Sequence, residues 1–156
     1  MSLNKKILSI ETSSNICGIS YIEGDNCIDS VDYDSSKKHT EVLPEYYCRL
    51  KKRTGFKLDS INAIAVSIGP GSFTGLRVGL SFAKGLAFSK ELPIIPVPTM
   101  MSLAYEIKEI YPKRGLIFSH ADTIFSQKIK WENNLPCADG SITLLTLEKF
   151  LDENEN

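Results

Sequence analysis

The chain begins with apolar runs that are too short for helices and are separated by turn residues. Runs of this length, bounded by Gly, Asp or Asn, are typical of strands. A turn within residues 24–26 joins two of them, which indicates an antiparallel meander near the N-terminus. The run that includes Ile64, Val66 and Ile68 is nearly continuous, as expected of a strand covered on both faces. The predicted strands are residues 6–12, 15–23, 26–33, 61–68 and 93–97.

Other segments repeat apolar or small residues with the period of a helix. Residues 40–53 place apolar side chains at i, i+3, i+4 and i+7, with Thr40 as the expected N-cap and Gly55 at the end. A third helix is expected from Pro98 to about Ile110. In the second helix, residues 73–89, small residues recur every fourth position, so another backbone can approach that face closely. These small residues are Gly75, Gly79, Ala83 and Ala87.

A Gly-Pro-Gly-Ser turn at residues 69–72 separates the strand at 61–68 from the second helix. A glycine turn before a helix can face an anion, because helix N-termini attract negative charge. The spacing fits neither common phosphate motif: no Gly-Lys pair follows, and the glycines are spaced G-x-G-x-x-x-G rather than G-x-G-x-x-G. An ordinary tight turn is therefore favoured over an anion-binding loop, with Ser72 or Thr74 capping the helix.

The rest of the chain reads as two strands within residues 115–132, a turn at Asp139-Gly140 and a short helix at 146–151. The order of elements before this region is β-β-β-α-β-α-β-α. Such an order suits a mixed sheet with helices packed over it, so the predicted fold class is α/β.

Composition limits the function classes. The chain has 156 residues and a net charge of −1, which is too neutral for a protein that grips RNA by its phosphates alone. Four cysteines lack the spacing of a metal site or a redox pair, so we expect free thiols in a reducing compartment. No apolar run is long enough to span a membrane, and we expect a cytoplasmic protein.

Three segments resemble the TsaB (YeaZ) family of tRNA threonylcarbamoyladenosine biosynthesis proteins. They are ILSIETS at residues 7–13, KHTEVLP at 38–44 and GPGSFTGLRVGL, followed by AKGLA, within 69–87. Their order and spacing also match, and the resemblance covers about residues 6–110. It implies a ribonuclease-H-like lobe of the actin/Hsp70/sugar-kinase (ASKHA) superfamily over residues 1–111, with a truncated second lobe over 112–156.

The resemblance also implies a function. Members of this family are non-catalytic paralogues of TsaD, so the chain is expected to be a scaffold subunit and not an enzyme. It would pair with a TsaD-type subunit during threonylcarbamoyl transfer to the tRNA adenosine beside the anticodon. A TsaE-type ATPase is a possible third partner, tRNA would be met only through the complex, and the free protein could form a homodimer. No cofactor is expected.

Two groups of residues are candidate sites. A remnant phosphate site would use Glu11, Thr12, Gly69, Gly71 and Ser72, although a polar strand end whose side chains cap local backbone is the favoured interpretation. In the family, the partner interface is built from the helices that match residues 40–53 and 73–89. The interface residues predicted on this basis are Leu43, Tyr46, Tyr47, Leu50, Gly79 and Ala83.

Catalytic and metal sites are not expected. TsaD binds metal through a helical H-x-x-x-H pair, but the position four residues after His39 is Leu43, and His120 lies on another segment. No G-x-S-x-G nucleophile motif is present. The alternative hypothesis is a nucleotide-binding or peptidase-like enzyme of the sugar-kinase superfamily, annotated in older usage as a glycoprotease. It would require Glu11, Thr12 and the 69–72 turn to face a nucleotide.

Overall fold

The structure is a computed structural model that describes residues 4–34 and 39–153. The chain divides into two compact units, each with its own sheet. The five-stranded unit comprises Met1–Ile68 and Ser72–Val97, and the three-stranded unit comprises Gly69–Gly71 and Pro98–Asn156. Each unit is described below on its own.

The five-stranded unit is built on a mixed sheet in the order β3-β2-β1-β4-β5. Strands β1, β2 and β3 form the predicted antiparallel meander, while β4 and β5 run parallel to β1. All five residues of β4 are buried, as its continuous apolar run predicted. The strands are β1 (Lys6–Glu11), β2 (Ile16–Glu23), β3 (Asn26–Asp34), β4 (Ala63–Ser67) and β5 (Ile94–Val97), with a short 3₁₀ turn, η1, at Leu58–Ser60.

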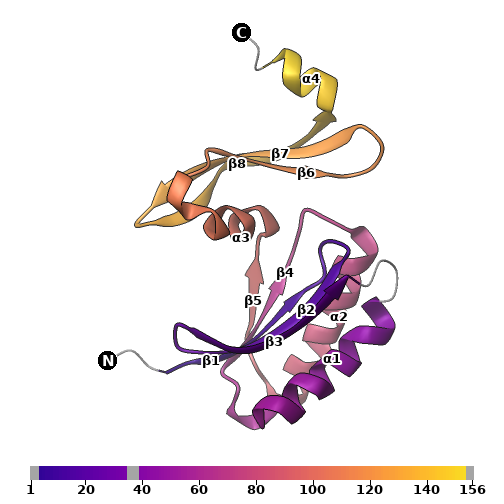
Figure 1. The fold of residues 1–156 in the computed structure, drawn as a ribbon, viewed down its shortest axis with the longest axis vertical. Coiled ribbons are helices and arrows are strands. Elements are labelled where there is room, and N and C mark those ends of the chain that lie inside the picture. Colours follow the sequence, from indigo (N-terminus) through magenta and orange to yellow (C-terminus); the bar gives the residue numbers. More distant parts are fainter. Residues whose placement is uncertain (1–3, 35–38, 154–156) are drawn as a thin grey trace. The chain divides into compact units, whose positions relative to one another are not determined.

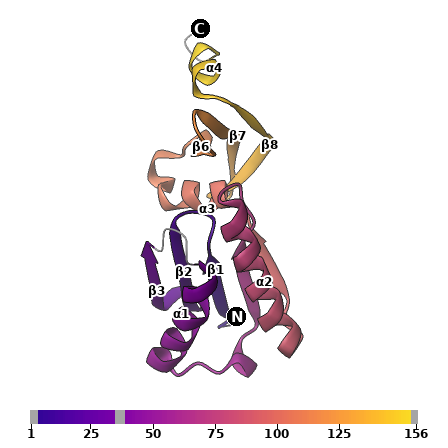
Figure 2. The ribbon, with the colours of Figure 1, turned by 90° about the vertical axis from the view of Figure 1, so that its right-hand side faces the viewer.

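Helices α1 (His39–Thr54) and α2 (Phe73–Lys90) cover one face of this sheet (Figures 1 and 2). The helix α2 has the predicted Ser72 N-cap. The helix α1 already begins at His39, so Thr40 lies in its first turn and was wrongly expected to be the cap. The position before His39 lies outside the described residues. Gly55, with φ +70°, follows α1 as predicted, and its N–H donates to the Lys51 carbonyl.

The three-stranded unit holds an antiparallel sheet in the order β6-β7-β8 with helix α3 on one face. Met100, Met101 and Ala104 of α3 pack with Ile129 of β7 in a small core. Helix α4 follows the last strand, capped by Thr146. The elements are α3 (Thr99–Glu106), η2 (Lys108–Ile110), β6 (Arg114–Phe118), β7 (Thr123–Glu132), β8 (Leu135–Thr146) and α4 (Leu147–Asp152).

The turn expected at Asp139-Gly140 is wrong, because both residues lie inside β8. The chain reverses instead at Asn133 and Asn134, whose φ values of +51° and +63° belong to the left-handed region that asparagine tolerates. Gly140 has φ +91° and sits where the β7–β8 register shifts. Its carbonyl accepts a hydrogen bond from the Gln127 side chain at 3.1 Å. The glycine therefore marks a bulge, which resembles a turn in sequence.

Packing divides the chain after Val97, since α3 makes its contacts with the β6-β7-β8 sheet. The lobe boundary expected at residues 111/112 stays a prediction about the family's architecture. Among the described residues, no helix combines the length and hydropathy needed to cross a bilayer.

Candidate functional site

The end of β1 and the start of α2 are joined by backbone and hydroxyl hydrogen bonds. Ser72 Oγ accepts from the Gly75 N–H at 3.2 Å and so caps α2. The Ser72 N–H donates to the Ser13 carbonyl at 2.6 Å. The Glu11 carboxylate in turn accepts from the Ser13 N–H. This end of the sheet is thus held by polar groups that bond to the chain's own backbone.

Thr12 lies under the small-residue face of α2. Its side chain is fully buried, and its Oγ1 has no hydrogen-bond partner among the described residues. A Cβ added at Gly79 would lie 2.2 Å from Thr12 Oγ1, and one added at Gly75 would lie 2.1 Å from the Thr12 carbonyl oxygen. Gly75 and Gly79 are therefore needed for the close approach of helix and strand.

Glu11, Thr12 and Ser72 of the predicted phosphate site do meet at one end of the five-stranded sheet. Each has a structural explanation there: Glu11 and Ser72 bond local backbone, and Thr12 is sealed beneath α2. Gly69 and Gly71 belong to the three-stranded unit, where the Gly69 carbonyl accepts from the Thr99 N–H at 2.9 Å. A phosphate-binding role for this set stays a prediction.

His39 anchors the start of α1. Its Nε2 lies 3.1 Å from the Ser14 carbonyl oxygen, to which it donates. Within residues 4–34 and 39–153, no three His, Cys, Asp or Glu side chains are grouped as metal ligands.

The Cys17 thiol is buried in β2. Burial, and to a smaller extent the Glu11 carboxylate, raises the pKa of this thiol to about 11, so it stays protonated at neutral pH.

Most residues of the predicted partner interface lie in the core of the five-stranded unit. Leu43, Leu50 and Ala83 are fully buried, Tyr46 is 7 % exposed and Gly79 packs on Thr12. Tyr47 is half-buried, with its ring against those of Phe56 and Phe82. The apolar stripes of α1 and α2 face their own sheet, which is the usual role of such a stripe. Most of these side chains therefore pack within this unit, and a role for the predicted set in binding a partner stays a prediction.

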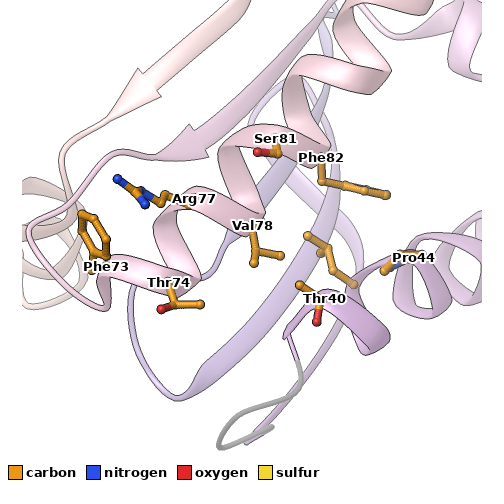
Figure 3. A pocket seen from close by; sticks show the side chains of 9 residues that line it. Thr40, Pro44, Phe73, Thr74, Arg77, Val78, Ser81 and Phe82 are labelled. Carbon is orange, nitrogen blue, oxygen red and sulfur yellow. The ribbon is translucent and has the colours of Figure 1, made fainter.

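A groove remains between α1 and α2 on the side away from the sheet (Figure 3). It has a volume of about 440 Å³ and is lined mainly by apolar atoms. Val78 and Phe82 of α2 face Pro44 of α1 across it. At one end, the Arg77 guanidinium lies 3.8 Å from the centre of the Phe73 ring. The other lining residues are Thr40, Leu43, Thr74 and Ser81.

The outer face of α2 exposes two aromatic rings, one of which belongs to Phe73 at the end of this groove. Phe73 is 68 % exposed and Phe88 is 90 % exposed. Gly85 lies between them along the helix, and a Cβ placed there would meet nothing. A sequence signal was available: Phe73 and Phe88 fall off the period of the buried stripe, so they cannot point to the core that Gly79 and Ala83 face. We call Phe73, Arg77, Ser81, Gly85 and Phe88 the outer stripe.

Comparisons with known proteins agree with this fold. YeaZ from Pseudomonas aeruginosa superposes with a TM-score of 0.82 at 24% sequence identity, covering 91% of this chain and 68% of that one. The strand order 3-2-1-4-5 and this superposition show a mixed α/β fold shared with YeaZ. The expected fold class is confirmed.

Sequence comparison is more specific. The profile of the TsaD family, described as tRNA N6-adenosine threonylcarbamoyltransferase, matches residues 32–123. The TsaB protein of Escherichia coli K12 is 35% identical over 99 residues, which are 64% of this chain and 42% of that protein. A tRNA N6-adenosine threonylcarbamoyltransferase of Borrelia garinii is 31% identical over 147 residues, 82% of this chain and 44% of that protein. The chain belongs to the TsaD family and, within it, to the TsaB (YeaZ) type.

The chain spans about half the length of the curated relatives it matches. Their activities, substrates and partners are therefore the subject of the proposal that follows.

Proposed function

We propose that this chain is a non-catalytic subunit in the biosynthesis of threonylcarbamoyladenosine on tRNA, where it pairs with a TsaD-type transferase. Relatives named for both components of this biosynthesis match the chain. The observation that carries the proposal is the apolar groove between α1 and α2, which the exposed ring of Phe73 lines, together with the exposed ring of Phe88 farther along α2. Exposed aromatic residues on a monomer are characteristic of protein–protein contact.

A scaffold role also agrees with the chemistry of the strand end. A nucleotide site of this superfamily would need polar groups that are free to turn toward phosphate. Here the Glu11 carboxylate and the Ser72 hydroxyl already accept bonds from local N–H groups, and Gly75 and Gly79 of α2 cover Thr12. A ligand would have to replace these bonds, and their loss would cost part of its binding energy.

The outer stripe suits a partner helix. The distance between the axes of two packed helices is about 8–10 Å and depends on the side chains at the crossing point. Ser81 and Gly85 supply small residues between the two phenylalanines of α2. The rings of Phe73 and Phe88 would then insert beside the partner's backbone as anchors. The same surface would be open to a second copy of this chain when the TsaD-type subunit is absent.

The test is co-purification of the full chain with the TsaD-type protein of its source organism. Phe88→Arg should leave circular dichroism unchanged and weaken association at least tenfold, because a buried aromatic anchor typically contributes more than about 1.4 kcal/mol. The matched control is Tyr33→Arg, since Tyr33 is 70 % exposed on β3 and lies outside the groove and the outer stripe. Equal affinity of wild type and Phe88→Arg would remove this surface from the proposal.

The functional part of the proposal needs a second measurement. Threonylcarbamoyladenosine formation on tRNA should require both proteins, with a TsaE-type ATPase added where the organism encodes one. Glu11→Ala should retain activity in the complex, since this carboxylate is assigned a structural bond rather than a reacting partner. A complex that assembles normally but loses all activity with Glu11→Ala would contradict the non-catalytic assignment.

A further inference from the structure

A second hollow, within the three-stranded unit, carries chemistry that the scaffold role does not use. It has a volume of about 390 Å³ and lies where the end of α3 and η2 meet the turn between β7 and β8. Its polar and aromatic lining consists of two tyrosines, two asparagines, one lysine and one glutamate. They are Tyr105, Lys108, Glu109, Tyr111, Asn133 and Asn134.

One wall of the hollow is fixed before any ligand arrives. Tyr111 Oη donates to Asn134 Oδ1 at 3.2 Å, which leaves the amide NH₂ of Asn134 as a donor. The Tyr111 ring meets the Trp131 ring edge-on, with centroids 5.0 Å apart. The Trp131 indole is itself held by its Nε1–H bond to the Pro112 carbonyl at 3.0 Å. This series of contacts orders an aromatic ring beside an amide edge.

Other lining side chains come from the last turn of α3 and from η2. Tyr105 is 44 % exposed, and the Lys108 ammonium lies 4.5 Å from its ring centroid and 3.4 Å from its Oη. The tyrosines thus offer ring surface to solvent, and Lys108 offers a positive charge within the same hollow. Glu109 places a negative charge in the same hollow, so a ligand there would be held mainly by ring stacking and amide hydrogen bonds, with Lys108 as a single phosphate contact.

We propose that this hollow binds one unpaired nucleotide of an RNA chain. Proteins hold unstacked RNA bases by three kinds of contact. The base stacks on an aromatic ring such as tyrosine, its edge forms hydrogen bonds with an amide, and a cation contacts the phosphate. Duplex RNA does not offer a base for such contacts, because its bases are paired and stacked within the helix. The choice of RNA as the source of the nucleotide rests on the proposed role in tRNA modification.

The probe is a fluorescently labelled anticodon stem-loop RNA, titrated by anisotropy with the full chain alone. Tyr105→Ala should weaken binding by roughly 5- to 100-fold, the range found for loss of one stacked base. Tyr105→Phe keeps the ring and should bind like wild type. Tyr33→Ala, the matched control at a more exposed tyrosine elsewhere, should also bind like wild type. With a single phosphate contact, log K should fall against log salt with a slope near −0.7.

Each further outcome decides the proposal. No binding of the loop RNA by wild type, equal binding of a blunt duplex of the same stem, or an equal loss with Tyr33→Ala would overturn it. If AMP binds as tightly as the stem-loop and competes with it, the ligand is a free nucleotide and RNA is the wrong source. The assay omits the TsaD-type subunit, so a failure of the scaffold proposal leaves this result interpretable.

Discussion

The two units of the molecule bury apolar side chains on very different scales. Among the described residues, the core of the five-stranded unit contains 15 buried residues from β1, β2, β3, β4, α1, α2 and the segments between them. The core of the three-stranded unit contains four, namely Met100, Met101, Ala104 and Ile129. Because burial of apolar surface is the main stabilising term, most of the folding free energy resides in the five-stranded unit.

The backbone shows the same contrast. Of the non-glycine residues with positive φ in the described part of the chain, one lies in the five-stranded unit and four lie in the three-stranded unit. Left-handed conformations cost energy in residues that carry a Cβ. The five-stranded unit therefore combines a larger buried core with fewer left-handed residues than the three-stranded unit. The four in the three-stranded unit are Tyr111, Ala121, Asn133 and Asn134.

The largest effect should separate the units directly. Ile64 is fully buried in β4, and Ile64→Ala should destabilise the five-stranded unit by about 2–5 kcal/mol through lost burial and a cavity. Ile129→Ala, the matched change in β7, should raise exchange only in α3 and β6–β8. Hydrogen exchange resolved by peptide measures both. Equal loss of protection in β1 and β4 from Ile129→Ala would show that the units unfold as one.

A second prediction tests why the five-stranded unit is tightly packed. Gly75→Ala should cost about 1–3 kcal/mol, because the new Cβ would overlap the Thr12 carbonyl and backbone cannot move aside easily. Gly85→Ala on the same helix faces open space and should stabilise by up to about 1 kcal/mol. Thermal unfolding of the two variants should therefore shift in opposite directions. Similar shifts would mean that close approach of α2 to β1 is not what requires Gly75.

A smaller effect should appear in the three-stranded unit. Ala121 has φ +51° in the connection between β6 and β7. Ala121→Gly should relieve that conformation and stabilise this unit by up to about 1 kcal/mol, less the added freedom of the unfolded chain. Slower hydrogen exchange in β6 and β7, with β1–β5 unchanged, is the expected result. Faster exchange there would indicate that the alanine is not strained.

The smallest effect concerns pH. The pKa of the Cys17 thiol is raised to about 11 in the folded state by burial and then by Glu11, against about 9 for a solvated thiol. Between about pH 9 and 11 the folded state therefore keeps a thiol proton that the unfolded state has lost. The stability that Cys17 contributes through this proton is fully present below about pH 9 and is lost as the pH rises to about 11. The unfolding free energy should fall more steeply over this window in wild type than in Cys17→Ala. Parallel curves would place Cys17 in contact with solvent.

Much of the five-stranded unit follows from sequence because its local and tertiary signals agree. The i, i+3, i+4, i+7 pattern of α1, the Ser72 cap and the continuous apolar run of β4 each have one favourable structure. The hairpin at Asn133–Asn134 was missed because Asp139-Gly140 is the stronger turn signal. That glycine serves a bulge inside a strand, and only cross-strand register distinguishes the two.

The candidate interface could not be placed from sequence for a related reason. A stripe of small and apolar residues is required both against a sheet and against a partner, so Gly79 and Ala83 carry no mark of which they meet. The structure assigns them to the sheet, since Thr12 fills the space above Gly79. The residues that we propose for a partner, Phe73 and Phe88, are exposed and lie off the period of the buried stripe.

The edges of the five-stranded sheet have a consequence for how this chain can associate. Its outer strands are β3 and β5. Pro96 removes a hydrogen-bond donor from β5, and β3 presents Asp29, Asp32 and Asp34 along its length. Proline and charge at an edge both oppose the addition of a further strand, and with it the growth of cross-β aggregates. The proposed association through the helical side therefore does not compete with strand addition at the sheet edges, and the sheet is a poor template for aggregation.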